Sequence, residues 1–292
     1  WVVANVNAST SSNLDDSKVR VVGLLDIFGF ESFKINRFEQ LCINYTNEKL
    51  QQKFTVDLFK TVQQEYDDER VPWSHIAFPD NAAVLALIDG RMGVVDVLNE
   101  ECVRPRGSDE GFVSKLNTLH GAGKGEEGHP KYVASRLRKD QFTVKHYAGD
   151  VTYTATSWLE RNNDALPEDL NQVAKTSNFE LLAALFADNK STTGSGPTGS
   201  AATAAPAAPG GRKKKGGLAA DTVSTKFKAQ LAQLMDEIER TSVQYVRCVK
   251  PNTKKSNHTY YAKMVAEQLR CAGVIEAIRV SRAGYPNKLQ HG

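Results

Sequence analysis

The sequence predicts an α/β protein that is mostly helical, with strands of a central sheet and a small β-hairpin. Three patterns carry this prediction. Residues 19–28 form a nearly continuous apolar run rich in Val and Leu, which is typical of a strand buried on both faces of a sheet. Residues 38–58 and 223–238 each repeat apolar side chains at helical spacing. Residues 141–154 carry two alternating runs around a turn, which is the pattern of a hairpin.

Length and composition favour one large domain or two modest ones, because the chain has 292 residues, of which 40% are hydrophobic. The net charge is only +3, so no global field points to nucleic acid or to a membrane surface. The cysteines are widely spaced, which favours reduced thiols in a cytosolic protein: Cys42, Cys102, Cys248 and Cys271. No stretch approaches the ~20 apolar residues of a membrane span, and none resembles a signal peptide. Because the chain starts at Trp1 without a Met, we expect a fragment of a longer protein.

The end of the first apolar run is the first candidate site, because Asp26, Gly29 and Glu31 follow one another within six residues. Open α/β sheets bind ligands just beyond the carboxyl ends of their strands, so Asp26 is placed where a metal–phosphate complex would lie. Gly29 lets the backbone approach a ligand closely. Spacing alone leaves open the alternative of a buried strand that ends in an ordinary turn.

The first quarter of the chain predicts turns, the strand and then a long helix. Residues 5–18 are polar and predict turns before the strand. After the strand, Asn36 can cap a helix, with Glu39 as the other half of a capping box. The helical face is predicted to continue into an acidic, solvated end at residues 65–70, and Pro72 ends it.

The middle of the chain predicts three shorter helices before the hairpin and further helices after it. The three helices are expected at residues 82–88, 94–101 and 110–119. A Gly- and charge-rich loop is predicted at residues 121–129. Helical patterning returns from Trp158 and again over residues 179–186.

Residues 188–220 are the clearest internal boundary. Ser, Thr, Gly, Ala and Pro dominate there, and such a segment cannot bury enough apolar surface to fold. It carries one basic cluster at residues 212–215. A helix capped by Asp221 follows, and then a short strand is predicted at residues 245–249. The last predicted helix starts near Tyr260 and is interrupted by a glycine.

Four segments, in order along the chain, resemble the motor domain of myosins. Residues 26–31 (Asp-Ile-Phe-Gly-Phe-Glu) are identical to the switch II element of that family, and residues 38–52 resemble its relay helix almost letter for letter. Residues 246–252 and 268–276 match two further myosin segments. The resemblance implies the C-terminal half of a myosin motor, a partial P-loop NTPase-type fold with strands of the central sheet, a lower actin-binding subdomain and a small β-hairpin.

The resemblance also implies a division of the chain into six parts. These are residues 1–37, the switch II strand and turn; 38–71, the relay helix; 72–187, the lower actin-binding subdomain with a helix–loop–helix and the hairpin; 188–220, a disordered basic loop 2; 221–259, a helix and a central-sheet strand; and 260–292, reactive-thiol helices that lead to a converter outside the chain.

Within switch II the resemblance implies three catalytic roles. Asp26 would hold Mg²⁺ through a bound water, the backbone N–H of Gly29 would donate to the γ-phosphate of ATP, and Glu31 would pair with an arginine of switch I. ATP and Mg²⁺ are therefore the implied cofactors, and both need residues outside this chain.

The relay helix and the thiol-bearing helix would carry movement rather than chemistry. The implied coupling residues are Phe38, Tyr45, Asn47, Phe54, Cys271 and Gly273. Cys271 matches the second reactive thiol of the family, and Gly273 matches the glycine about which that helix pivots. Periodicity alone would make the relay helix an ordinary core helix, and both roles need the same apolar face.

Actin is the implied partner. Residues 94–119 resemble the helix–loop–helix of the lower half of the actin-binding cleft, although three ordinary amphipathic helices are the alternative. The basic cluster resembles loop 2, which gives long-range, salt-sensitive attraction to acidic residues. The predicted actin-binding residues are Val103, Arg104, Arg106, Asp109, Arg212, Lys213, Lys214 and Lys215. Light chains or calmodulin would bind regions outside this chain, no nucleic acid or transmembrane segment is expected, and the expected location is cytoplasmic and cytoskeleton-associated.

A phosphate-binding P-loop is missing from the sequence. It needs G-x-x-x-x-G-K-[ST], and residues 121–124 imitate only its end, because Gly125 follows instead of Ser or Thr. We therefore expect actin-stimulated Mg-ATP hydrolysis from the intact motor and none from this segment alone. The alternatives are a truncated, ATPase-dead chain that binds actin passively, a polybasic nucleic-acid binder, and a chain whose unpaired strands aggregate.

Overall fold

The structure is a computed structural model that describes residues 1–11, 20–72, 80–123, 127–163, 168–186 and 222–274, with the single residues 278 and 282. It divides into two units. The first unit holds Trp1–Ile27 and Asp164–Ala219, and the second holds Phe28–Asn163 and Ala220–Gly292. The basic loop predicted at residues 188–220, with its cluster at residues 212–215, lies outside the described residues.

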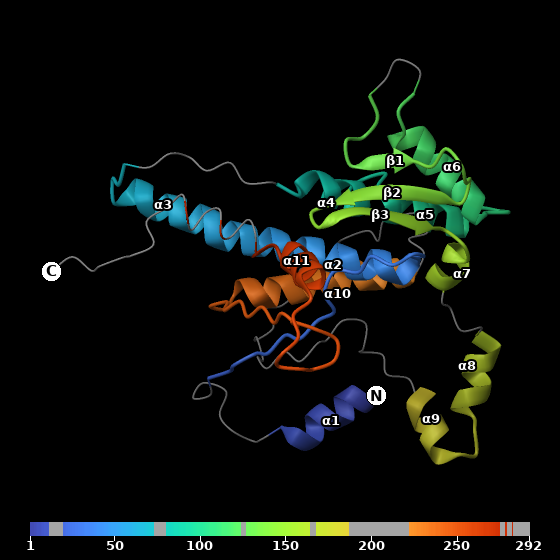
Figure 1. Cartoon of the computed structure of the whole chain (residues 1–292). Coiled ribbons are helices and arrows are strands. Elements are labelled where there is room, and N and C mark those ends of the chain that lie inside the picture. The colour runs from blue at the N-terminus through green and yellow to red at the C-terminus, as the bar shows by residue number, and fades with distance from the viewer. Residues whose placement is uncertain are drawn as a thin grey trace, which may run out of the picture. The chain divides into compact units, whose positions relative to one another are not determined.

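The described part of the first unit contains the helices α1 (Val2–Thr10), α8 (Glu168–Lys175) and α9 (Glu180–Phe186) (Figure 1). α9 confirms the helical pattern predicted over residues 179–186. α1 corrects the turns predicted at residues 5–10, and residues 12–18 of that prediction lie outside the described residues. Its polar side chains bond back to carbonyl groups of the same helix, as Thr10 Oγ1 does to Val6 at 2.9 Å, so they do not compete with it.

The strand predicted over residues 19–28 is wrong for its described part, residues 20–28. These residues pair with no described strand and expose their apolar side chains, and Leu24 is 95% exposed. A strand buried on both faces needs paired neighbours, and the described strands pair with one another and, through a single bridge at Tyr153, with Asn36. Residues 245–249 likewise form no strand, and Val246 is 83% exposed. The predicted central-sheet strands are therefore not formed among the described residues.

The long helix predicted from residue 38 is confirmed. α2 (Phe38–Thr55) continues through a π-helical turn, η2 (Val56–Lys60), into α3 (Thr61–Asp68) (Figure 1). Phe38, Leu41 and Tyr45 lie three and four residues apart and are all buried. The wider turn of η2 changes the direction in which later side chains point, so the helix presents a different face beyond Val56.

The start of α2 differs from the predicted cap. The N-cap is Arg37, whose backbone N–H donates to Gln40 Oε1 at 2.9 Å. The side chain of Asn36 is used elsewhere, because its Oδ1 accepts the N–H of Phe33 at 2.8 Å and its Nδ2 donates to the carbonyl of Thr152 at 3.0 Å. The predicted Asn36–Glu39 capping box is therefore wrong, since a long-range bond to the hairpin takes the amide.

Four further helices of the second unit surround the core: α4 (Ala82–Asp89), α5 (Val94–Val103), α6 (Asp109–His120) and α7 (Trp158–Asn162). They confirm the three short helices predicted before the hairpin, each within two residues at either end. They also confirm the helical pattern predicted from Trp158. The spacing of apolar side chains was enough to predict these helices, because each helix has one apolar face.

The sheet has three antiparallel strands in the order β1 (Tyr132–Ala134), β2 (Gln141–His146) and β3 (Gly149–Thr154). β2 and β3 are the predicted hairpin, and their last pair joins His146 to Gly149. Gly149 has φ +142°, a conformation that only glycine adopts readily, so it closes the turn. β1, which pairs Val133 with Thr143, was not predicted.

The core of the second unit is aromatic. Trp158 is fully buried, and its ring centroid lies 5.6 Å from those of Phe112 and Phe142. Tyr153 is also fully buried and lies 5.7 Å from Phe142. These residues come from α6, α7, β2 and β3, so the core ties the helices to one face of the sheet.

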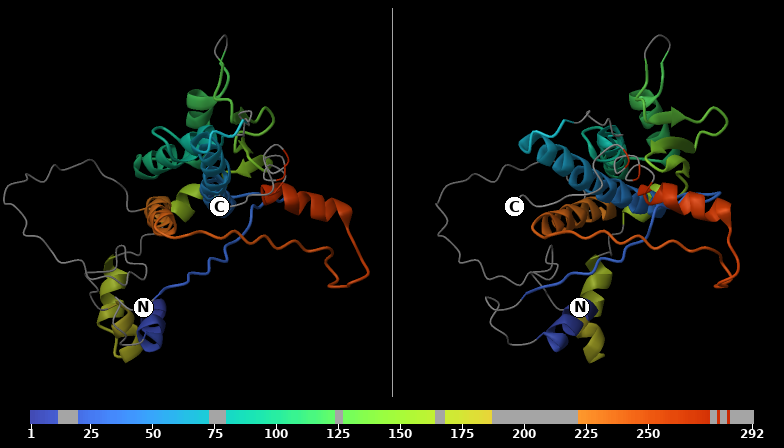
Figure 2. Two further views of the ribbon diagram at one scale, coloured as in Figure 1. Left: turned by 90° about the vertical axis from the view of Figure 1, so that its left-hand side faces the viewer. Right: turned by 60° about the vertical axis from the view of Figure 1, so that its left-hand side comes forward.

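α10 (Val223–Glu239) lies beside α2 (Figure 1), and α11 (Ala262–Cys271) follows after an irregular segment that loops outward (Figure 2). The N-cap of α10 is Thr222, whose side chain accepts from Thr225 N at 3.3 Å, rather than the predicted Asp221. α11 begins two residues after the predicted Tyr260. Among the described residues, no helix is both long enough and apolar enough to cross a membrane.

Candidate functional site

Two asparagine side chains of α2 hold the backbone on either side of Gly29. Asn47 Nδ2 donates to the carbonyl of Phe28 at 3.0 Å. Asn44 Oδ1 accepts the N–H of Glu31 at 2.8 Å, and its Nδ2 donates to the carbonyl of Glu31 at 2.8 Å. Because the two asparagines lie three residues apart, they share one face of the helix. Residues 28–31 are therefore hydrogen-bonded to α2 at both ends.

The three predicted catalytic residues have different surroundings. Gly29 is exposed, and a Cβ added there would meet no heavy atom within 4 Å. Glu31 is half-buried, and its Oε2 accepts from Gln40 Nε2 at 3.2 Å. Asp26 is exposed and belongs to the first unit. Only Gly29 and Glu31 are thus placed together, on the N-terminal half of α2.

The described residues contain no group of three or more His, Cys, Asp or Glu side chains that could hold a metal ion. Mg²⁺, however, takes only one or two carboxylates from a protein when water and phosphate supply its other ligands. The exposed carboxylate of Asp26 fits contact through a water, and the open space at Gly29 fits the close approach of a phosphate. Each residue, taken by itself, fits the role predicted for it.

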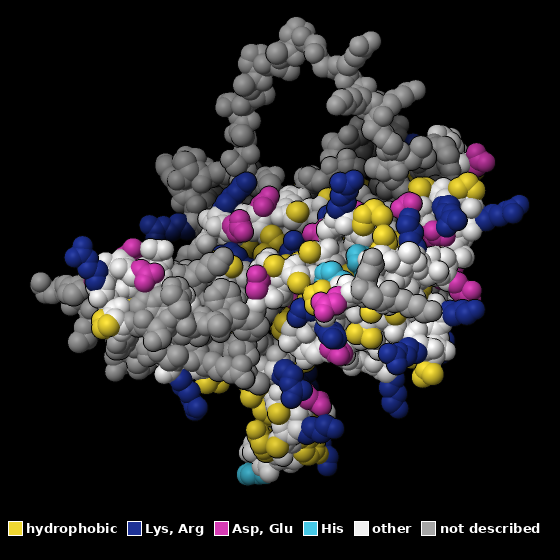
Figure 3. All heavy atoms as spheres, turned by 90° about the horizontal axis from the view of Figure 1, so that it is seen from above, with side chains coloured by type: hydrophobic (Ala, Val, Ile, Leu, Met, Phe, Trp, Pro, Cys, Tyr) yellow, Lys and Arg dark blue, Asp and Glu magenta, His cyan; other side chains and the backbone are white. Residues whose placement is uncertain are grey.

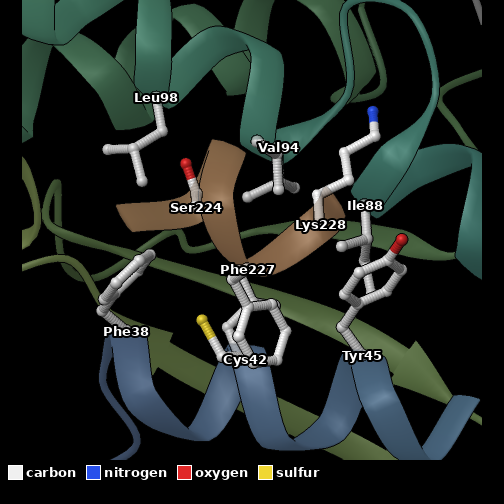
Figure 4. A pocket seen from close by; sticks show the side chains of 11 residues that line it. Phe38, Cys42, Tyr45, Ile88, Val94, Leu98, Ser224, Phe227 and Lys228 are labelled. Atoms are coloured by element: carbon white, nitrogen blue, oxygen red, sulfur yellow. The ribbon is translucent and has the colours of Figure 1, made fainter. Parts of the chain in front are cut away.

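The first half of α2 presents predicted coupling residues to two other helices. Phe38 lies edge-on to Trp158 of α7, with ring centroids 5.8 Å apart. Tyr45 faces Phe227 of α10 at 6.5 Å. Figure 4 shows Phe38, Tyr45 and Phe227 pointing into a small apolar hollow between α2, α5 and α10. Its other lining residues include Cys42, Ile88, Val94 and Leu98. A shift of α2 would therefore be felt by α7 and α10 together.

The second half of α2 is tied to the segment that precedes α11. Phe54 lies edge-on to Tyr245 at 4.9 Å, and the guanidinium of Arg247 lies 5.0 Å from the Phe54 ring. The Tyr245 hydroxyl donates to Asp57 Oδ2 at 2.6 Å. These contacts lie where α2 passes into η2, so the change in helix type coincides with an anchor point.

The end of α11 meets both α2 and the hairpin. The hydroxyl of Tyr147 donates to the carbonyl of Cys271 at 2.7 Å. Gly273 has φ +66°, and a Cβ there would lie 2.4 Å from Nε2 of Gln51. Partial burial raises the pKa of the Cys271 thiol, although the charge of Arg270 acts in the opposite direction. The structure thus places Cys271 against Tyr147 of the hairpin turn and Gly273 against Gln51 of α2. Neither contact partner was among the predicted coupling residues.

The turn between α5 and α6 is fixed from inside. The buried carboxylate of Glu101 accepts the N–H of Ser108 at 3.2 Å and pairs with Arg104 at 3.4 Å. The side chains that this turn exposes include those of Val103, Arg104 and Arg106. Three of the predicted actin-binding residues therefore lie together on one preformed turn.

Asp109 is engaged inside the fold. Its carboxylate accepts the N–H of Ser157 at 2.7 Å and the N–H of Leu159 at 3.0 Å, so it caps the start of α7. It was predicted to meet actin together with Val103, Arg104 and Arg106. The structure does not bring its carboxylate together with these three side chains.

The basic side chains of the described surface form no single large patch on the face in Figure 3, where Lys and Arg are interspersed with Asp and Glu. One basic projection was missed by the sequence analysis. Arg136 and Lys139 are exposed between β1 and β2, around Leu137, which is 97% exposed. The run Arg-Leu-Arg-Lys just before the hairpin was the signal available for it.

Asn44 was also missed, although its position carries a signal. Phe38, Leu41 and Tyr45 define the buried face of α2, and Asn44 and Glu48 fall on the same face. A polar side chain on a buried helix face needs hydrogen-bond partners in the core. This pattern could have marked both residues before the structure was known.

Comparison with known proteins establishes the family. The sequence model of the myosin head (motor domain) matches residues 1–292. Human unconventional myosin-Va is 39% identical over 297 residues, which cover 99% of this chain and 16% of that protein. Myosin-52 of Schizosaccharomyces pombe is 38% identical over 292 residues (99% and 18%), and Myosin-2 of Arabidopsis thaliana is 38% identical over 299 residues (100% and 22%). The chain belongs to the myosin head (motor domain) family and spans between 16% and 22% of the length of these relatives.

Proposed function

We propose that this chain forms part of an actin-based motor that couples Mg-ATP hydrolysis to movement along actin filaments. The observation that carries the proposal is the pair of contacts from Asn44 and Asn47 to the backbone on either side of Gly29. If Gly29 meets the γ-phosphate, these contacts join the phosphate sensor directly to α2. A sensor bonded to a long helix is the arrangement that converts a small local shift into a larger one elsewhere.

At the nucleotide, this chain supplies one wall of the site. When bound, Mg²⁺ would neutralise the charge that develops during phosphoryl transfer. Asp26 would hold a water of the metal's shell, the N–H of Gly29 would donate to a γ-phosphate oxygen, and Glu31 would pair with an arginine outside this chain. The P-loop also comes from outside this chain. The intact protein is therefore the ATPase, and this segment alone is inactive.

Transmission follows from the contacts of α2. Movement of residues 28–31 toward the phosphate pulls on Asn44 and Asn47, and so on the helix that carries them. The far half of α2 then moves against Gly273. The backbone of Gly273 packs closely against the side chain of Gln51, so a shift of α2 displaces it directly. The displacement is passed in this way to the end of α11.

Actin is the proposed partner, with the exposed turn of Val103, Arg104 and Arg106 as one contact and the basic residues 212–215 as another. Positive charge speeds the encounter with an acidic filament, and this effect weakens as salt rises. Because Glu101 fixes the turn from inside, binding would need little further ordering of the turn. Light chains or calmodulin bind regions outside this chain, and the motor is associated with the cytoskeleton.

A second candidate function is passive actin binding by a chain without ATPase activity. The absence of G-x-x-x-x-G-K-[ST] from the sequence favours it. This alternative predicts binding to actin that salt weakens and that ATP leaves unchanged.

The motor proposal is tested by the actin-activated ATPase of the full-length protein with Gly29→Ala. A Cβ at this position meets nothing within 4 Å, so the substitution leaves the fold intact and obstructs only the approach of the phosphate. We expect turnover to fall by about 100-fold, the size of effect seen when one hydrogen-bond donor to a developing charge is lost. Equal turnover in Gly29→Ala and the wild type contradicts the sensor role. A wild-type protein without turnover favours passive binding.

A further inference from the structure

A chain of buried polar side chains runs from Glu31 through the hairpin to Glu48. Asn44 Nδ2 lies 2.9 Å from the hydroxyl of Tyr153, and this hydroxyl lies 2.8 Å from His146 Nε2. His146 Nδ1 lies 2.9 Å from Glu48 Oε1. Asn44, Tyr153 and Glu48 are fully buried, and His146 is 6% exposed. Polar groups buried in this way are costly unless each one is hydrogen-bonded.

Glu48 fixes the positions of the protons in this chain. Its carboxylate accepts hydrogen bonds, so the ring proton of His146 sits on Nδ1 and is donated to Glu48. His146 Nε2 then accepts the proton of Tyr153, and the Tyr153 oxygen accepts from Asn44 Nδ2. The other tautomer would leave the Tyr153 proton without an acceptor and would set a bare ring nitrogen against a carboxylate.

Glu48 anchors the far end of the chain. Besides His146, its Oε1 accepts the N–H of Tyr147 at 3.0 Å, and its Oε2 accepts from Asn81 Nδ2 at 2.6 Å. Asn81 Nδ2 also donates to the backbone carbonyl of Glu48 at 2.7 Å. The anchor is therefore held by the hairpin turn and by the start of α4, independently of residues 28–31.

The side chain of Phe30, which precedes Glu31 in the sequence, packs against the end of the hairpin. The ring of Phe30 lies edge-on to His146 at 5.3 Å and to Tyr147 at 5.5 Å. The hairpin thus receives both the side chain of Phe30 and, through Asn44, the backbone of Glu31.

We propose that Tyr153, His146 and Glu48 are positioning residues for Glu31, because they fix the Asn44 amide in the one orientation that clamps both backbone groups of Glu31. The inference rests on the proposed function, in which Glu31 closes the nucleotide site. A reversed amide would set its NH₂ against the N–H of Glu31 and its oxygen against the Glu31 carbonyl, so both bonds are lost together. The two bonds from Asn44 to Glu31 therefore form together or not at all, and the network favours the amide orientation in which both form.

The test uses the full-length protein with Tyr153→Phe and, as a second variant, Asn44→Ala. Tyr153→Phe removes one hydroxyl and keeps the ring. Hydrogen exchange by mass spectrometry follows the amide of Glu31, and steady-state kinetics follow ATP turnover. We expect exchange at Glu31 to become at least about fivefold faster in both variants. We also expect kcat to fall about tenfold while KM for ATP changes less than about twofold, because positioning acts on the closed state and not on substrate binding.

Two control variants separate positioning from general loss of stability. Asn162→Ala removes an equally buried amide from α7, where it accepts from Ser224 N at 2.9 Å. Thr143→Val removes a hydroxyl bond of 2.8 Å to Thr152 from the more exposed face of the same hairpin. We expect both controls to leave exchange at Glu31 unchanged.

Unchanged exchange at Glu31 in a folded Tyr153→Phe protein overturns the inference, and if that variant does not fold, the same result in Asn44→Ala overturns it. Faster exchange with unchanged kcat also overturns it, because the clamp then has no part in turnover. Failure of the proposed function appears separately, in Glu31→Gln. That variant keeps both backbone bonds, so wild-type turnover there refutes the role of Glu31 while the exchange results still report on the clamp.

Discussion

The carboxylate of Asp89 lies 2.5 Å from Nζ of Lys228, and this ion pair joins α4 to α10. The same ammonium group donates to the backbone carbonyl of Asp89 at 2.9 Å. The other carboxylate oxygen lies 3.3 Å from Nζ of Lys49 on α2. One partly buried carboxylate at the end of α4 therefore holds α2 and α10 side by side, next to the hollow of Figure 4.

Asp89→Asn should destabilise the protein at neutral pH by about 1 kcal/mol, a small effect because solvent partly screens the pair. Partial burial raises the pKa of Asp89, but hydrogen bonds from Lys228 and Tyr45 and the charges of Lys228 and Lys49 outweigh it and lower the pKa below its usual 3.8. A lowered carboxyl pKa stabilises the fold above the unfolded value, and this contribution is lost as pH falls through the folded pKa.

Urea unfolding of wild type and Asp89→Asn at about pH 7 and about pH 3 measures this effect, and the difference in unfolding free energy between the two proteins should be smaller at the lower pH. Asp140→Asn is the control, because its pair with Arg138, at 2.7 Å, is more exposed and should contribute less. An equal difference between wild type and Asp89→Asn at both pH values would contradict the assignment.

Gly273→Ala should loosen the end of α11 from α2. The new Cβ would lie 2.4 Å from the Gln51 side chain, and φ of +66° costs a non-glycine residue about 1 kcal/mol by itself. Adding Gln51→Ala to the Gly273→Ala protein should restore the unfolding free energy that the clash removes. It should not restore the free energy that the positive φ removes. A double-mutant cycle on unfolding free energies measures the coupling. Strictly additive effects would show that the two residues do not meet.

Arg106→Ala should weaken actin binding without lowering stability, because Arg106 is exposed on the turn between α5 and α6. Asp109→Ala should leave actin binding unchanged and lower the free energy of unfolding by about 1 kcal/mol, because it removes the cap of α7. Cosedimentation with actin at low and high salt, together with thermal unfolding, separates the two effects. An equal loss of affinity in both folded variants would place Asp109 on the actin-binding face after all.

Alkylation should modify Cys271 before Cys42. Burial raises the pKa of Cys42 to about 12, and the charge of Glu39 adds to the shift. The pKa of Cys271 is also raised by burial, but Arg270 counteracts it. Since the thiolate is the reactive form, Cys42 should react at least about tenfold more slowly at mildly alkaline pH. A time course of iodoacetamide labelling read by peptide mass spectrometry decides, and equal rates would contradict the predicted order.

Most helices of the second unit could be predicted because their signal is local. The spacing of Phe38, Leu41 and Tyr45 is enough to define the buried face of α2. The strands at residues 19–28 and 245–249 failed because an apolar run indicates burial without naming a partner, and strands form only in pairs. The cap at Asn36 failed for a related reason, since its amide bonds to Thr152, 116 positions away.

The candidate site divides in the same way. Gly29 and Glu31 stand in a contiguous motif and could be named from the sequence. The network that holds Glu31 could not, because it closes between Asn44 and Tyr153, 109 residues apart, and between Glu48 and His146, 98 residues apart. The sequence places polar residues on a buried helix face, and only the fold says which ones meet.

The central claim is that this chain belongs to a motor whose affinity for actin is controlled by ATP. The most direct measurement is cosedimentation of the full-length protein with actin filaments, with and without Mg-ATP. We predict that ATP weakens binding at least about tenfold, a coupling free energy of about 1.4 kcal/mol or more, and that Gly29→Ala remains bound in ATP. Binding that is the same with and without ATP would contradict the account and would leave passive actin binding as the function.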